Sequence, residues 1–205
     1  PFIGLATTAS LKCCTASVKL GTRNREMSRA KDAFDLGMGD AEVLLARLYD
    51  KDAKLTQEHG EVHKRAALLL ACAAWETYVE ERVNESLAAK IDATGSNDFT
   101  EFVKRKFEED LKSFNNPNAE KTRRLFRDFL TVKDVTHFWR LPGYTPEQAS
   151  ERLDTLLKKR GHAAHHTRPA KQGTPAAHLI SKPELEKGLN FLKMLVDATE
   201  KGLGA

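Results

Sequence analysis

The groups best able to transfer protons and bind anions are concentrated between Leu153 and His166, in the sequence LDTLLKKRGHAAHH. Arg160 is followed within six residues by His162, His165 and His166. An arginine is always charged and can donate two hydrogen bonds to one phosphate, whereas a histidine titrates near neutrality and can give or take a proton. The pattern predicts either a site that binds a phosphate and moves a proton, or a cationic helix end favoured by the helix dipole.

Arg160 and His165 would diverge if one unbroken helix carried both. At about 100° per residue, five positions place their side chains about 140° apart. Gly161 directly follows the arginine, and a break in the helix at this glycine would let the two side chains converge. We therefore predict that one helix ends at Arg160 and that His165 lies on the next turn.

The segment from His59 to Thr94 is the longest periodic stretch and is the element that would support such a site. It has no Gly or Pro after Gly60, and Gly95 follows where a helix would stop. Glu76 lies about 40° from the centre of its apolar stripe, either at the edge of the core or as an orienting partner for the basic cluster. The stripe consists of Leu68, Cys72, Trp75, Val79, Val83, Leu87 and Ile91.

Shorter periodic segments and capping signals predict the remaining helices. No segment alternates with period two, so we expect an all-α fold, a helical bundle of about five or six helices. The Gly37–Gly39 region is poor helix material, which places the start of the first helix at Asp40. The predicted helices are about Asp40–Gln57, His59–Thr94, Asn97–Phe114, Lys121–Val132, Thr145–Arg160 and Ser181–Lys201.

Between Lys121 and Arg140, six basic residues face two acidic ones and are interleaved with Phe126, Phe129, Phe138 and Trp139. Such a mixture can bind nucleic acid through phosphate pairing and base stacking. It is equally typical of an amphipathic helix whose basic face is solvated.

Charge and cysteine content narrow the class of protein. The net charge of +4 is concentrated in residues 1–26, which carry +3 and leave +1 for residues 27–205, so no general affinity for nucleic acid is expected. Three cysteines at these spacings form neither a disulfide framework nor a zinc motif, which favours a cytoplasmic setting. No run of residues is long and apolar enough for a membrane span. We treat residues 1–39 as an N-terminal extension with a possible native start at Met27, and residues 40–205 as the domain.

Other candidate chemistry is weaker. His59 and His63 have the spacing of metal ligands on a helix, but no third ligand is evident nearby. Cys72 lies within an apolar stripe and is expected to be a buried structural thiol. No glycine-rich phosphate loop or nucleophile elbow is present, so we expect neither a metal nor a cofactor.

The chain resembles the RiboL-PSP-HEPN branch of the HEPN superfamily over about residues 40–201. The resemblance is carried by Arg160 and His165, which are separated by four residues, by the helix with Ala-Ala-Trp75-Glu76, and by the closing Leu185–Thr199 helix. The position after the arginine is usually polar in this family, often Asn, whereas here it is Gly161. His162 would then be the substitute polar group.

This resemblance implies a metal-independent endoribonuclease. His165 would take the proton of an RNA 2′-hydroxyl or protonate the leaving 5′-oxygen, and Arg160 would stabilise charge on the phosphate, giving a 2′,3′-cyclic phosphate and a 5′-hydroxyl. It further implies a homodimer with two motifs in one cleft, and the role of a toxin or anti-phage defence effector with an antitoxin or other partner protein. His162 and His166 are alternative second groups. The RNA-binding candidates are Lys158, Lys159, Arg168 and Lys171.

Two alternatives remain open. The chain could be a catalytically inactive HEPN module that binds RNA, a nucleotide or a protein partner, which Gly161 and the nearly neutral charge of residues 27–205 favour. It could also be a structural helical bundle, in which Arg160 has no role in binding or activity.

Overall fold

The computed structural model describes residues 28–165 and 180–204 of the chain. In these ranges all regular elements are helical and no strand is formed, which confirms the predicted all-α bundle. None of the described helices is long and apolar enough to cross a membrane. The elements are α1 (Arg29–Tyr49), the short 3₁₀ helix η1 (Lys51–Ala53), α2 (Gln57–Thr94), α3 (Asp98–Lys112), α4 (Ala119–Leu130), the 3₁₀ helix η2 (Val135–Phe138), α5 (Pro146–His165) and α6 (Lys182–Leu203).

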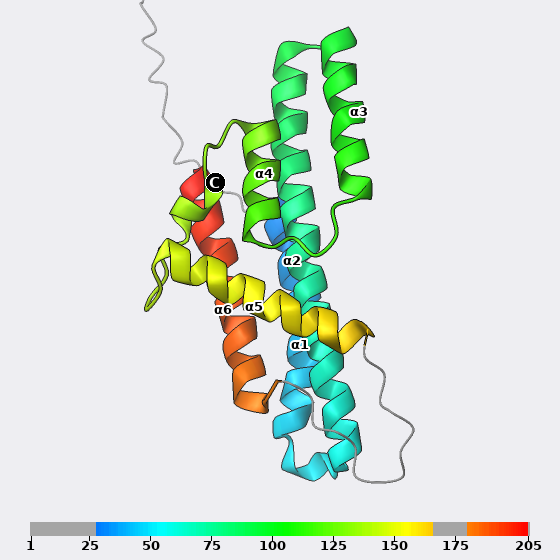
Figure 1. Ribbon diagram of the computed structural model, residues 1–205. Helices are drawn as coiled ribbons and strands as arrows, with labels where there is room; N and C mark the ends of the chain where they lie inside the picture. Colours follow the sequence, from blue (N-terminus) through cyan, green and yellow to red (C-terminus); the bar gives the residue numbers. More distant parts are fainter. Residues whose placement is uncertain (1–27, 166–179, 205) are drawn as a thin grey trace, which may run out of the picture.

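Helix α2 is the central strut of the bundle, as its periodicity predicted. Its 38 residues span about 57 Å at 1.5 Å per residue. Helix α1 runs antiparallel along its N-terminal half, while α4, α5 and α6 also pack against it (Figure 1). All seven side chains of the predicted stripe are buried. Gly95 ends the helix with a φ of 84°, in the region that favours glycine.

An aromatic cluster around Trp75 joins the helices in the middle of the molecule. The Trp75 ring contacts Tyr78 and Trp139, with centroids 5.8 and 6.1 Å away. Trp139 donates from its indole nitrogen to the Thr199 hydroxyl on α6 at 3.0 Å. Tyr78 contacts Phe34 of α1 edge-on. Because Trp75 and Trp139 are fully buried with their N–H groups satisfied, this cluster fixes how α1, α2, η2 and α6 meet.

The predicted limits of the first helix were wrong. Helix α1 begins at Arg29, capped by the Ser28 hydroxyl, and ends at Tyr49, so residues 29–39 belong to the packed bundle. Gly37 allows the close approach of α1 to α2, because a Cβ at this position would lie 3.1 Å from the Ala74 Cβ. Tertiary packing therefore compensates for the low helix propensity of glycine.

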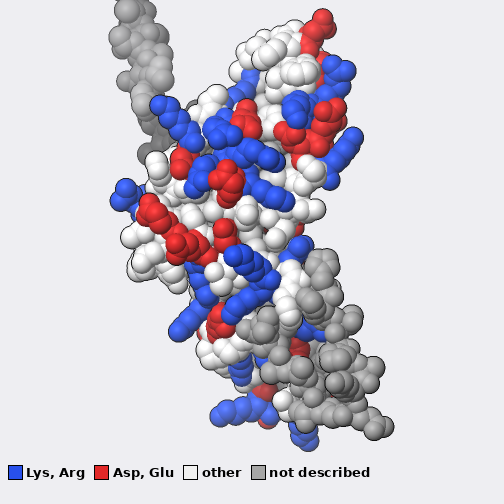
Figure 2. Space-filling model, viewed as in Figure 1, with Lys and Arg blue, Asp and Glu red and all other residues white. Residues whose placement is uncertain are grey.

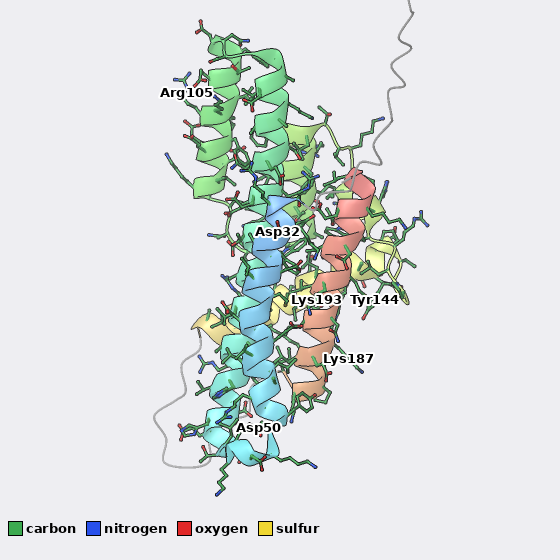
Figure 3. All side chains as sticks on the ribbon, turned by 180° about the vertical axis from the view of Figure 1, so that it is seen from behind. Asp32, Asp50, Arg105, Tyr144, Lys187 and Lys193 are labelled. Atoms are coloured by element: carbon green, nitrogen blue, oxygen red, sulfur yellow. The ribbon has the colours of Figure 1, made fainter. Side chains whose placement is uncertain are left out.

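Helix α3 is less well covered than its apolar spacing suggested. Phe107 and Phe114 are buried, but Phe99 and Phe102 are 71% and 55% exposed. The helix begins with a capping box formed by Asn97 and Thr100. Seen from behind, Arg105 points away from α2 on the outer side of α3 (Figure 3).

The two glycines of α1 provide a matched test of this packing. Gly37→Val is expected to lower the free energy of unfolding by about 1–3 kcal/mol, since the new side chain meets Ala74. Gly39→Val should be neutral or slightly stabilising, because no atom lies within 4 Å of a Cβ there. Urea unfolding followed by circular dichroism measures both. Equal effects of the two substitutions would contradict the close approach of α1 to α2 at Gly37.

Candidate active site

The candidate site lies where α5 crosses α2 (Figure 1). The N-terminus of α5 is fixed by the predicted capping box, in which the backbone N–H groups of Thr145 and Gln148 each donate to the other residue's side-chain oxygen. The helix then continues through Gly161 to His165. The predicted break at Gly161 was wrong. This glycine has no positive φ, and a single glycine costs a helix only about 1 kcal/mol.

Arg160 projects from α5 onto Glu76 of α2. Its Nη2 lies 3.5 Å from the Glu76 Oε2, and both side chains are largely covered, with 25% and 20% of their surfaces exposed. The Nε of Arg160 is buried without a hydrogen-bond partner. The ion pair is therefore a loose one, and one N–H donor of the guanidinium remains unused, which is costly in a buried setting.

Glu76 is itself held by the turn between α3 and α4. The backbone N–H of Asn116 donates to its Oε1 at 3.0 Å, and the neighbouring Pro117 carbonyl accepts from Trp75 at 2.9 Å. Asn116 adopts a left-handed conformation with a φ of 53°, which asparagine tolerates better than most residues. Two adjacent residues of α2 thus fix this turn, and the turn orients the carboxylate that contacts Arg160.

A hydrogen bond from α2 holds the C-terminal end of α5. Arg65 donates from its Nη2 to the Ala163 carbonyl at 2.8 Å, which satisfies one of the carbonyl groups that a helix end leaves unpaired. His162 is exposed on this last turn. The structure describes His165 only as the last residue of α5. His166, Arg168 and Lys171 lie outside the described residues.

The two lysines before Arg160 differ in their surroundings. Lys158 is exposed. Lys159 forms an ion pair with Glu184 at the start of α6, and this hydrogen bond is the main reason that the pKa of Glu184 is lowered. Arg152 lies 3.8 Å from the same carboxylate. Lys159 therefore links α5 to α6, whereas Lys158 is accessible to a ligand.

Comparison with known families identifies the domain. The model of the RiboL-PSP-HEPN family matches residues 40–205. The chain belongs to this family. HEPN domains are generally RNases or nucleotide-binding modules. No curated protein and no solved structure matches the chain.

Cys72 lies under the crossing of the two helices in this HEPN domain. It is 1% exposed, and burial raises the pKa of its thiol to about 12, with a smaller opposing effect of the Arg160 charge and a further rise caused by Glu76. A thiol with so high a pKa is not a nucleophile near neutrality. This agrees with the predicted structural role of Cys72 and leaves Arg160 and Glu76 as the charged groups beside it.

The basic-aromatic segment after Lys121 is an amphipathic helix with a solvated face. Phe126 and Trp139 are fully buried, so they are not stacking platforms. Lys and Arg atoms gather over α4, with acidic atoms among them (Figure 2). Arg123 pairs with Glu120 and Asp134. Arg127 pairs with Asp128, so two of the four cations of α4 have a carboxylate partner.

No group of three or more His, Cys, Asp or Glu residues within the described ranges could hold a metal ion. The Nδ1 of His63 lies 2.8 Å from the His59 carbonyl oxygen, one turn earlier in the same helix. Arg160 and Glu76, both candidates from the sequence, lie against each other. The contacts of Arg65 and Asn116 with this region span 98 and 40 residues and were not predicted.

Gly161→Ala tests the continuity of α5. Because this position is helical and a Cβ meets no atom within 4 Å, the substitution should raise the free energy of unfolding by about 0.5–1 kcal/mol. Chemical denaturation measures this change. A loss of stability would show instead that Gly161 adopts a conformation that only glycine reaches readily.

Proposed function

We propose that this HEPN domain is a metal-independent endoribonuclease in which Arg160 and His165 act on the phosphate that is cleaved. His165 would accept the proton of the RNA 2′-hydroxyl as this oxygen attacks the adjacent phosphorus, or would donate a proton to the leaving 5′-oxygen. Arg160 would stabilise the negative charge that develops on the phosphate oxygens. The products would be a 2′,3′-cyclic phosphate and a 5′-hydroxyl.

The observation that carries the proposal is the state of Arg160. Its guanidinium forms a loose ion pair with Glu76 at 3.5 Å and keeps a buried Nε without a partner. A buried donor without a partner is costly, so an acceptor brought by a ligand would be favoured there. A phosphate oxygen that displaced or shared the Glu76 contact would receive charge-assisted hydrogen bonds from a side chain that is already positioned.

The unbroken helix supports a site built from two chains. Because Arg160 and His165 diverge by about 140° on one helix, a single chain presents them on different faces, and two copies related by a two-fold axis would complete the site. His162, on this last turn, is the candidate for a second proton-transfer group.

Two observations favour the second candidate function, a HEPN module that binds RNA, a nucleotide or a protein partner without cleaving RNA. The carboxylate of Glu76 already partly neutralises the charge of Arg160, and Gly161 occupies the position that is usually polar in the family. Under this alternative the domain would bind RNA with a strong dependence on salt but would form no cyclic phosphate. The role of a toxin or defence effector, with an antitoxin as partner, belongs to the first proposal.

Cleavage of defined RNAs by the purified protein tests the assignment. His165→Ala is expected to lower the rate by about 10²-fold or more because a proton-transfer group is lost, and Arg160→Ala by a similar factor. Glu76→Gln should have a smaller effect, about tenfold, because the arginine remains but is less well oriented. The products are identified by mass spectrometry as 2′,3′-cyclic phosphates.

Two variants serve as controls for this experiment. His137 is an exposed histidine on η2, and Arg47 is an exposed arginine paired with Asp50 at the far end of α1. His137→Ala and Arg47→Ala should cleave RNA at the unaltered rate. Full activity of His165→Ala would refute the role of His165 in cleavage. If no RNA were cut at any pH while salt-sensitive binding persisted, the second candidate function would replace the first.

The dimer makes a separate prediction. The specific activity should rise with protein concentration and reach a plateau where sedimentation equilibrium shows the dimer, because a lone chain holds only part of the site. Full specific activity at concentrations at which the protein sediments as a monomer would exclude a shared site and leave an intrachain second group.

A further inference from the structure

A groove between the C-terminal half of α2 and α3 is separate from the Arg160 site. It encloses a cavity of about 340 Å³. The two helices form a hairpin that projects beyond the remaining helices (Figure 1), and α3 stands away from α2 over most of its length. The groove is lined by Glu80, Glu81, Asn84, Leu87, Ala88 and Ile91 of α2 and by Lys104, Phe107, Glu108 and Leu111 of α3.

The floor of the groove is apolar. Leu87 and Ile91 on α2 and Phe107 and Leu111 on α3 are each one helical turn apart and line the cavity from its two sides. From Glu80 to Ile91 the lining of α2 extends about 16 Å at 1.5 Å per residue. The groove is thus long enough to accept about three turns of a helix but too small in volume to enclose one, so only side chains from one face would enter.

The rim of the groove is acidic. Glu80, Glu81 and Glu108 line it, and none of the three has an ion-pair partner among the described residues. Lys104 also lines it, but its ammonium group is 2.9 Å from Glu101. Arg105 lies on the outer side of α3 and points away from α2 (Figure 3). Across residues 80–112 nine acidic side chains outnumber six basic ones.

Burial, together with the neighbouring carboxylates, alters the titration of Glu80 in this groove. The pKa of Glu80 is raised to about 7, mainly by burial and then by the negative charges of Glu76 and Glu81. From α3, Lys104 and Glu108 face the same groove. A bound cation would favour the ionised form of Glu80. Without such a cation, the negative charges around the groove are not balanced.

We propose that this groove binds a basic amphipathic helix of another protein. Its walls are helices whose backbone groups are already hydrogen-bonded, so an extended peptide would gain no main-chain partners there. A helix satisfies its own backbone, can place apolar side chains spaced i, i+3, i+4 and i+7 on the floor, and can set lysines or arginines against the rim. Nucleic acid is disfavoured by the acidic rim. The groove contains none of the residues proposed for RNA cleavage. Along α2 it begins at Glu80, one turn after Glu76.

The probe is a fluorescent peptide of about 14 residues containing only leucine and lysine, with leucines at helical spacing. Full-length protein is titrated against it and binding is followed by fluorescence anisotropy. Glu108→Lys, in the groove, should weaken the affinity by about tenfold or more. Glu109→Lys is the matched control, since this neighbour is exposed and does not line the groove, and it should change the affinity less than about twofold. Ala88→Trp should block binding by filling the groove, with folding verified by circular dichroism.

The pH dependence supplies a second measurement. A cation in the groove lowers the pKa of Glu80 from about 7, so the affinity should rise with pH from the lowered pKa of the complex up to about pH 7 and level off above it, where Glu80 is ionised with or without the peptide. Glu80→Gln should remove this increase.

Four results would overturn the proposal. The first is equal weakening by Glu108→Lys and Glu109→Lys, and the second is equal binding of a peptide with the same composition but scrambled spacing. The third is failure of the full chain to bind while a protein that starts at Met27 binds, because residues 1–26, with a charge of +3, would then be the occupant. The fourth is a homodimer that Glu108→Lys dissociates, because the occupant would then be a second copy. None of these results depends on whether RNA is cleaved.

Discussion

Burial of the apolar stripe of α2 is the constraint on which the rest of the structure depends. Trp75 at its centre is fully covered, contacts Tyr78 and Trp139, and donates to the Pro117 carbonyl. Helices α1, α4, α5 and α6 all take their positions by covering this one helix. Because the residue after Trp75 is Glu76, the core that fixes the helices also fixes the carboxylate that meets Arg160. The carboxylate of Glu76 is therefore as well positioned as the core itself.

Apolar periodicity correctly predicted the helices whose positions depend on burying one face. Local helix propensity misplaced helix ends whose positions depend on contacts with residues distant in sequence. The stripe of α2 and the caps at Thr145 and Ser181 could be predicted because each depends on residues within one or two turns. The start of α1 could not, since the cost of Gly37 is offset by a close approach to Ala74, which is distant in sequence. At Gly161 the error was the reverse, because a helix break was predicted where the helix continues. A glycine permits a break, but nothing in the packing requires one.

The same distinction applies to the candidate site. Glu76 could be chosen as a candidate from the sequence because a carboxylate is unusual beside an apolar stripe. Its partner on the other oxygen, the N–H of Asn116, is a backbone group, and its position depends on how the α3–α4 turn packs. Arg65 is one of many arginines in the sequence, and only the fold places it on the Ala163 carbonyl. Pairings of this kind leave no periodic signal, so they cannot be predicted from spacing alone.

The candidate site and the groove share one helix, and their charges interact through it. Glu76 and Glu80 are one turn apart on α2, and the negative charge of Glu76 contributes to the raised pKa of Glu80. An electrostatic interaction is mutual, so ionisation of Glu80 adds negative potential at Glu76 and at the guanidinium of Arg160 beside it.

A cation bound in the groove would promote the ionisation of Glu80, but its positive charge would also offset the field of the ionised carboxylate. Because these two changes oppose each other, occupancy of the groove would alter the potential at Arg160 only modestly. Strong regulation of the site from the groove would require movement of α3 or of the Asn116 turn, which follows α3 in the chain and holds Glu76.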